Sequence, residues 1–277
     1  SSYVLPTPNE EFRELINNNK MQNLSLHSKL LIKCIPPPSG VLDQTFGNNG
    51  IVILDSVNGI GYSLVIDSNN NRLLLAGNSG TNIAIVAYNI NNGALDMTFA
   101  NNGVRITNLT NKDEASQIVI YNNEIYLAGT TVTGTGNISQ MTVLRYNING
   151  GFIYNNTIGQ ATTISFGKSI LVDTINNKVR VGGSNNNLIS YAQFTPDIFT
   201  LEQVSGYGSL PGIINTFIID NNNKLLLGGR YDNNFVIIRL INQNTIDNTF
   251  GTSGKVETES PCHRLSPVRT SPRSPEF

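Results

Sequence analysis

The chain has 277 residues, of which 13% are charged, and its formal net charge is −1. A balance this close to neutral argues against the broad basic surface used by proteins that bind nucleic acid or anionic membranes. No run reaches the roughly 20 apolar residues of a membrane span, and no basic and then apolar signal peptide is visible at the N-terminus. We therefore expect no nucleic-acid partner and no membrane span.

Residues 1–39 form the least regular part of the sequence. The Glu-rich stretch at residues 10–16 favours a short helix capped by Asn9, and a β-strand is the alternative. Residues 29–35 read as a strand that ends at the prolines 36–38, because proline cannot donate to a β-ladder. Counting one repeat back from Arg72 makes this region an N-terminal segment with a degenerate first repeat unit.

A nine-residue motif organises the chain from residue 40 to residue 260. It reads LDQTFGNNG at residues 42–50, LDMTFANNG at 95–103 and IDNTFGTSG at 246–254, with eroded copies at 152–159 and 198–204. We expect its Asp to accept backbone N–H groups in an Asx turn, its Thr to add a hydroxyl, and its Phe to lie between neighbouring units. The residues with these structural roles are Asp43, Thr45, Phe46, Asp96, Thr98, Phe99, Asp247, Thr249 and Phe250. Ala100 replaces the glycine of the other copies, so a positive φ is expected not to be required there.

A second landmark gives the period of the repeat. Asn-rich turns open into apolar strands at Arg72, Glu124, Lys178 and Lys224, which lie 52, 54 and 46 residues apart. Each unit offers about four short strands separated by Asn- and Gly-rich turns. In the first clear unit we expect strands at residues 51–54, 62–66, 73–76 and 83–89. Four antiparallel strands per unit of about 50 residues predict an all-β fold, a β-propeller of about five four-stranded blades with a degenerate first blade.

The composition changes after residue 260. Residues 261–277 contain no Asn and are rich in Pro, Ser and Arg. This composition is typical of a disordered or non-native tail, and a linear docking tail is the alternative.

The motif copies at residues 42–50, 95–103 and 246–254 resemble the delta-60 repeat family, whose repeats carry an L-D-x-T-F-G-x-x-G core. The resemblance covers roughly residues 40–260 and is specific in the first two units and in the last motif. It implies a propeller-like repeat array of bacterial surface proteins and some large-virus proteins. It implies no catalytic residue, because the family motif is structural.

Catalytic and metal chemistry find little support in the sequence. The only histidines are His27 and His263, and the only cysteines are Cys34 and Cys262. They form neither a nucleophile–base arrangement nor a metal-ligand cluster. The Asp- and Asn-containing segments 67–71 and 220–223 offer oxygen ligands for calcium, but they lie where a hairpin turn is already required. We expect no enzyme activity, no catalytic residues, no cofactor and no metal.

Tyrosines recur near the end of the third strand of three units. They are Tyr88, Tyr146 and Tyr191. A repeated aromatic could line one binding face, and packing at the edges of the units is the alternative.

The neutral surface and the repeat favour a non-enzymatic structural or interaction protein that scaffolds protein–protein contacts, with a protein partner or self-assembly. The Asn-rich composition favours a virion component or an extracellular or cell-surface location. A carbohydrate-binding propeller with a glycan partner is the alternative, although Trp is absent. A glycoside hydrolase, which needs paired carboxylates, is the third hypothesis.

Overall fold

The computed structural model describes residues 40–133, 138–158, 163–196, 200–241 and 245–258. The chain divides into two compact units, residues 1–51 and residues 52–277. The helix expected at 10–16, the strand at 29–35 and the degenerate first unit lie outside the described residues. So do the tail at 261–277, both histidines and both cysteines.

The described part of the first unit, residues 40–51, is one copy of the motif folded into a corner. The Phe46 amide donates to the Asp43 carbonyl (3.1 Å), and the Gly50 amide donates to the Phe46 carbonyl (2.8 Å). Gly50 has φ = +87°, and a Cβ there would lie 2.5 Å from the Cβ of Leu42. The glycine that ends the motif is therefore required by both conformation and space.

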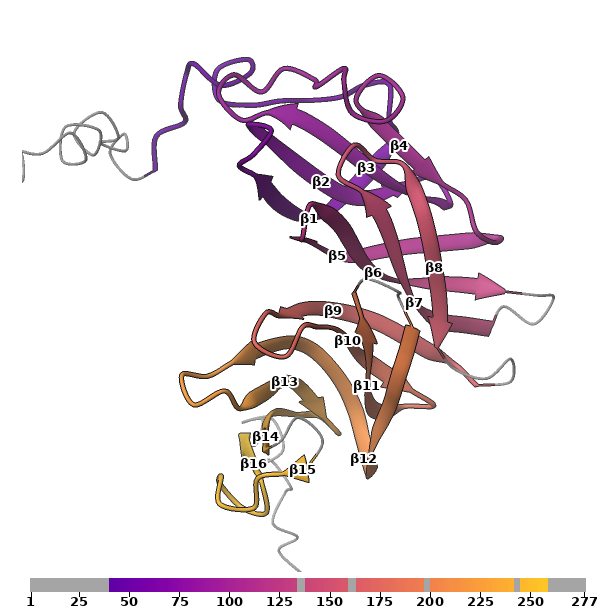
Figure 1. Ribbon diagram of the computed structural model, residues 1–277, viewed down its shortest axis with the longest axis vertical. Helices are drawn as coiled ribbons and strands as arrows, with labels where there is room; N and C mark the ends of the chain where they lie inside the picture. Colours follow the sequence, from indigo (N-terminus) through magenta and orange to yellow (C-terminus); the bar gives the residue numbers. More distant parts are fainter. Residues whose placement is uncertain (1–39, 134–137, 159–162, 197–199, 242–244, 259–277) are drawn as a thin grey trace, which may run out of the picture. The chain divides into compact units, whose positions relative to one another are not determined.

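The second unit begins with two four-stranded antiparallel sheets (Figure 1). The first sheet contains β1 (Gly59–Asp67), β2 (Arg72–Ser79), β3 (Asn82–Asn89) and β4 (Val104–Thr107). The second sheet contains β5 (Lys112–Tyr121), β6 (Glu124–Thr133), β7 (Ile138–Asn147) and β8 (Phe152–Ile158). In both sheets, each strand pairs with the next one along the chain.

The remaining strands form an eight-stranded sheet that repeats the same plan twice. Its members are β9 (Ser165–Asp173), β10 (Lys178–Asn185), β11 (Leu188–Thr195), β12 (Thr200–Ile219), β13 (Leu225–Tyr231), β14 (Asn234–Ile241), β15 (Thr245–Ile246) and β16 (Lys255–Thr258). The long strand β12 pairs with β11 through residues 200–211 and with β13 through residues 212–219. We call β9–β11 with the first part of β12 the third sheet, and the rest the fourth sheet.

The all-β fold with antiparallel sheets predicted from the sequence is confirmed. The described residues form strands and turns, and no helix among them is long and apolar enough to cross a membrane. The eroded motif copies are extended: residues 152–158 form β8, and β12 begins at Thr200.

One expected strand is absent. Residues 52–58 form no strand, and Ile51 makes only a single bridge to Asn48. In the first sheet the corresponding strand, β4, pairs with β3 of its own sheet. The described residues before 51 contain no strand that could take the place of β3, so the prediction of a strand at 51–54 is wrong.

Apolar side chains pack between consecutive sheets and form three buried clusters. The first joins the first and second sheets and includes Leu74, Ile85 and Leu127. The second joins the second and third sheets, and the third joins the third and fourth sheets. Each sheet is therefore stabilised by its neighbours rather than by a core of its own.

Polar bonds fix the register between the sheets. The Ile118 amide of β5 donates to the Ser63 hydroxyl of β1 (3.2 Å). One unit later, the Ile170 amide of β9 donates to the Gln117 side-chain oxygen of β5 (2.8 Å). The bond between the first and second sheets thus has a counterpart between the second and third sheets.

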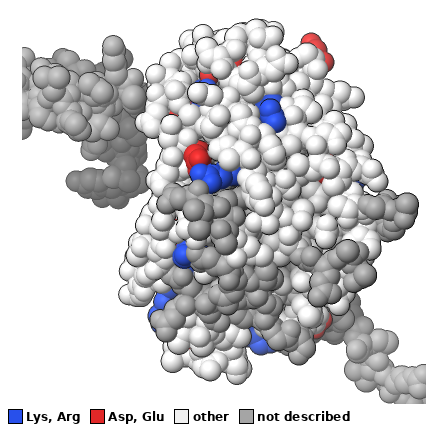
Figure 2. Space-filling model, turned by 45° about the vertical axis from the view of Figure 1, so that its right-hand side comes forward, with Lys and Arg blue, Asp and Glu red and all other residues white. Residues whose placement is uncertain are grey.

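Charged side chains are sparse on the face shown in Figure 2, and most of the described surface there is uncharged. This agrees with the low charge content of the sequence.

Candidate ligand pocket

The three motif aspartates each cap their own turn. Asp43, Asp96 and Asp247 accept the amide of the Thr two residues later at 2.9, 3.0 and 3.1 Å. The hydroxyls of Thr45, Thr98 and Thr249 donate to the same carboxylate oxygens at 2.7, 2.6 and 2.6 Å. The motif is therefore a turn closed by its own side chains.

In two copies the second carboxylate oxygen of the Asp binds the basic residue that opens a middle strand. Arg72 lies 3.3 Å from Asp96, and Lys224 lies 2.7 Å from Asp247. Burial alone would raise the pKa of Asp96, but hydrogen bonds from Thr98 and Arg72 outweigh it and lower that pKa. Hydrogen bonds from Lys224 and Thr249 likewise hold the pKa of Asp247 well below its ordinary value. The carboxylates of Asp96 and Asp247 therefore stay ionised and stabilise the motif turn.

The motif phenylalanines differ in burial. Phe99 is fully buried within the cluster between the first and second sheets. It packs under the Arg72 guanidinium, 5.1 Å from the ring centre. Phe46 and Phe250 are half-buried.

Ala100 has φ = +46°, close to the φ of Gly47 (+60°) and Gly251 (+56°) in the other copies. The expectation that a positive φ is not required there is wrong. The Ala100 amide donates to the Asn149 carbonyl of the second sheet at 2.8 Å, and this contact holds the left-handed conformation.

The three recurring tyrosines do not share one face. Tyr88 pairs with Leu73 and Tyr146 with Ile125, whereas Tyr191 pairs with Gly182. Phe194, which pairs with Val179, holds the matching position in the third sheet. Tyr146 and Tyr191 are fully buried, and only Tyr88 is partly open to solvent.

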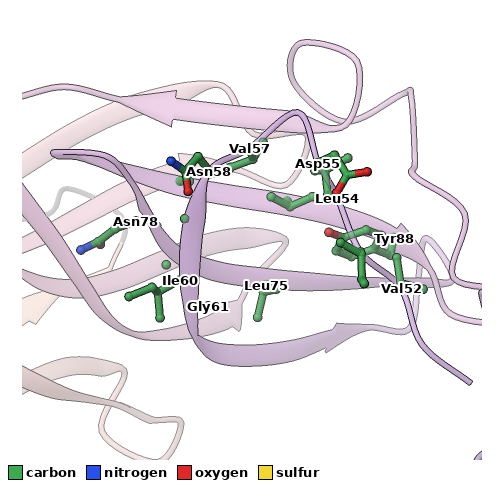
Figure 3. A pocket seen from close by; sticks show the side chains of 15 residues that line it. Val52, Leu54, Asp55, Val57, Asn58, Ile60, Gly61, Leu75, Asn78 and Tyr88 are labelled. Atoms are coloured by element: carbon green, nitrogen blue, oxygen red, sulfur yellow. The ribbon is translucent and has the colours of Figure 1, made fainter.

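Tyr88 lines a pocket of about 470 Å³ on one side of the first sheet (Figure 3). The floor is apolar and is formed by Leu75, Ala84 and Val86. Gly61 and Gly77 lie opposite each other in the β1–β2 pair, so no side chain fills that part of the floor.

Residues 52–58 arch over this floor and form the other wall of the pocket (Figure 3). The Gly80 amide donates to the Asn58 carbonyl (3.2 Å), and the Val57 amide donates to the Leu54 carbonyl (3.3 Å). Val52, Leu54 and Val57 are half-buried, whereas Ile53 is exposed. The arch therefore presents alternate apolar side chains to the pocket.

A few polar groups stand among these apolar walls. They come from Asp55, Asn58, Asn78 and Tyr88. Burial raises the pKa of the Tyr88 hydroxyl, so it remains a hydrogen-bond donor at neutral pH. The side-chain oxygen of Asn78 already accepts the Ala115 amide (2.9 Å) and links the pocket to the second sheet. Asp55 is the only charged residue among the described residues that line the pocket.

The site offers no evident place for a metal ion. No group of three or more His, Cys, Asp or Glu side chains gathers among the described residues. In the two segments considered for calcium, Asp67 binds Asn70 and Arg72, and Asp220 caps the amides of Asn222 and Lys224. Both segments are turns closed by their own hydrogen bonds.

Sequence reasoning singled out Tyr88 but missed the rest of the pocket. Residues 51–54 were expected to form a strand, and Asp55 and Asn58, which follow it, were not considered as site residues. The available signal was the sequence DSVNG at residues 55–59, whose turn-forming residues interrupt the apolar run.

No family model and no curated protein matches the chain. Among solved structures, a luciferin-regenerating enzyme aligns with a TM-score of 0.46 and 8% identity, over 69% of this chain and 62% of its own length. An exo-1,5-α-L-arabinanase from a bovine ruminal metagenomic library aligns with a TM-score of 0.42 and 10% identity, over 74% and 81%. The periplasmic gluconolactonase of Pseudomonas aeruginosa aligns with a TM-score of 0.36 and 8% identity, over 73% and 74%.

These comparisons contradict the expectation of a non-enzymatic scaffold, because all three structures are enzymes by name. We therefore do not retain that expectation. The reactions of these enzymes are not assigned to this chain, and its function is inferred below from its own pocket.

Proposed function

We propose that the protein binds a small ligand in the pocket between residues 52–58 and the first sheet. The observation that carries the proposal is the pocket itself, a concavity with an apolar floor and about as much polar as apolar surface in its lining. Its volume of about 470 Å³ lies within the range of roughly 300–1,000 Å³ that is usual for small-molecule sites.

The lining defines the class of ligand. Leu75, Ala84 and Val86 favour an apolar body, and the Tyr88 hydroxyl donates a hydrogen bond to a carbonyl or ether oxygen. Within the described lining, the carboxylate of Asp55 is the only charged group, and it disfavours anions. A neutral or cationic amphipathic molecule fits this lining best.

The repeat supplies the setting for the pocket. The sheets of the second unit act as blades of a β-propeller, with each sheet covering the face of the next. The motif copies support this assignment through their shared corner geometry. We also propose that these units are related to delta-60 repeats, on the basis of the shared motif.

Hydrolysis of the bound ligand is a second candidate function, favoured by the presence of Asp55 and Tyr88 on one pocket. The Asp55 carboxylate would accept a proton from water as the water attacks an ester or lactone carbonyl. The Tyr88 hydroxyl would donate to the oxyanion that forms. Asp55 would then return the proton to the departing oxygen.

Calorimetric titration with a panel of neutral and cationic amphipathic compounds, including lactones and glycosides, tests the binding proposal. Ala84→Leu fills the floor and is expected to abolish binding, whereas Ala94→Leu, at an exposed position outside this pocket, leaves it unchanged. Tyr88→Phe keeps the shape and is expected to weaken binding about tenfold by removing one hydrogen bond. Binding that is indifferent to both pocket substitutions would place the ligand elsewhere.

The same panel tests hydrolysis by product analysis. Asp55→Asn is expected to retain binding and lose at least about 100-fold in turnover if the carboxylate is the general base. Binding without turnover in the unsubstituted protein would remove the second candidate and leave the first intact.

A further inference from the structure

Every sheet of the second unit has two faces that occupy equivalent positions in the repeat. The leading face carries Leu64 in the first sheet, and Ile118, Ile170 and Phe217 in the next three. Their strand partners are Leu75, Leu127, Val181 and Leu227, which also correspond. The trailing face carries Ile85, Val143, Tyr191 and Ile237, whose partners are Ala76, Ala128, Gly182 and Gly228.

The leading face is buried in three sheets. In the first sheet its outer strand β1 is open, whereas residues 52–58 lie over Leu75, Ala84 and Val86. Ile118 and Ile170 are 3% exposed and Phe217 is 8% exposed, whereas Leu64 is 56% exposed. Ile66, two residues further along β1, is exposed as well. Strand β1 of the first sheet therefore presents to solvent a surface that its equivalents bury.

The trailing face shows the opposite pattern. Ile85, Val143 and Tyr191 are fully buried, whereas Ile237 of the fourth sheet is 44% exposed. The neighbouring row repeats this result: Ile83, Met141 and Ile189 are buried, and Phe235 is 80% exposed. Ile218 and Val256 extend the apolar surface of the fourth sheet.

The two open faces complement each other. The four sheets form three consecutive pairs. In each pair, the trailing face of one sheet packs on the leading face of the next sheet. The open trailing face of the fourth sheet and the open leading face of the first sheet are the two halves of one further interface of this kind. Large exposed apolar surfaces of this kind mark interaction sites.

A hydrogen bond shared by two of the interfaces within the chain could also form in this pair. Ser63 and Gln117 accept amides from Ile118 and Ile170 of the following sheet. Thr216 holds the same position in the fourth sheet, opposite Gly228, and it is exposed. In an equivalent interface its hydroxyl would accept the amide of Leu64.

We propose that the trailing face of the fourth sheet binds the leading face of the first sheet in a second copy of this chain. The occupant is a second copy because each open face continues a pattern whose other half the chain itself carries. The contact is heterologous, so successive copies build a closed ring or a filament. It goes beyond the ligand pocket, which lies on the same face of the first sheet beneath residues 52–58.

Sedimentation velocity of the full chain over a wide range of concentration tests the proposal. The unsubstituted chain is expected to associate as concentration rises. Leu64→Glu and Ile237→Glu are each expected to weaken association by about 100-fold or more, because an unpaired carboxylate would be buried at the contact. Ile175→Glu, which introduces the same charge at an exposed turn position, is expected to associate like the unsubstituted chain.

Mixing the two blocked variants gives the decisive result. Leu64→Glu keeps an intact fourth sheet and Ile237→Glu keeps an intact first sheet, so the mixture is expected to form a one-to-one dimer that grows no further. A chain that stays monomeric at every concentration would overturn the proposal, as would association that survives both substitutions. A mixture that stays monomeric would overturn the head-to-tail pairing. Neither Leu64 nor Ile237 lines the pocket, although Leu64 pairs with Leu75 of its floor. The ligand titration is therefore repeated with Leu64→Glu at concentrations where it is monomeric, so that failure of the contact and failure of the pocket are distinguishable.

Discussion

Ala100 illustrates how a single residue can keep a backbone conformation that its side chain disfavours. Its φ of +46° lies in the left-handed region, and its amide is held by the Asn149 carbonyl of the second sheet. An L-residue pays roughly 1–2 kcal/mol for this conformation, and glycine does not.

We expect Ala100→Gly to raise the free energy of unfolding by about 0.5–1 kcal/mol, after allowance for the larger entropy of glycine in the unfolded chain. Urea denaturation measures the change. Ala94→Gly, at an exposed position without a positive φ, is the matched control and should lower stability. A decrease for Ala100→Gly of the same size as the control would contradict the argument.

Buried ion pairs make the free energy of unfolding depend on pH in the acid range. Asp173 lies 2.5 Å from Arg180, and both side chains are almost completely buried. Burial alone would raise the pKa of Asp173, but hydrogen bonds from Asn176 and Arg180 outweigh it and lower that pKa. The pKa values of Asp96 and Asp247 are lowered as well.

A carboxylate with a lowered folded pKa stabilises the protein above its unfolded pKa of about 3.9, and this stabilisation is lost as pH falls towards the folded value. We expect unfolding free energy to be nearly constant from pH 7 to about pH 5 and to fall below about pH 4. Asp173→Asn should cost about 3 kcal/mol at neutral pH, because Arg180 stays buried, and should flatten the acid dependence. Asp232→Asn, at an exposed turn position, is the control and should change neither.

At the scale of the element, equivalent strand positions are buried or exposed according to whether a neighbouring sheet packs on them. Ile85 of β3 and Ile237 of β14 occupy the same place in the repeat, yet Ile85 is buried and Ile237 is half open. The energetic value of the position depends on the neighbouring sheet and not on the strand that carries it.

We expect Ile85→Ala to lower the unfolding free energy by about 2–5 kcal/mol, through lost burial and a cavity. Ile237→Ala should change it by less than about 0.5 kcal/mol at concentrations where the chain is monomeric. Chemical denaturation of the pair measures both. Equal losses would mean that the fourth sheet is covered within the chain.

The strands were largely predictable because Asn-rich turns and apolar runs alternate at a fixed period. The register was less predictable. Tyr191 was matched to Tyr88 by residue type, whereas the backbone pairs Phe194 in that place. Aligning the units on the polar residue that ends each strand, Asn89 and Thr195, would have found Phe194.

The burial of charges was not predictable from the sequence either. Arg72 and Arg180 begin or follow polar turns, where basic residues are normally solvated. Their carboxylate partners lie five and seven residues earlier, across a hairpin, and only the pairing of the strands brings them together.

At the scale of the whole molecule, the array of sheets determines where a ligand can enter. The first sheet has no other sheet on its leading face among the described residues, and only the arch of residues 52–58 covers it. The pocket therefore depends on the irregular segment that breaks the repeat. Sequence patterns identify the repeat but not the position of such a segment.

The pocket proposal is tested most directly by diffraction from crystals soaked with a library of small amphipathic fragments. The account predicts bound fragments between residues 52–58 and the floor formed by Leu75, Ala84 and Val86, with a polar atom at the Tyr88 hydroxyl. An empty pocket in crystals whose other surfaces bind fragments would contradict it.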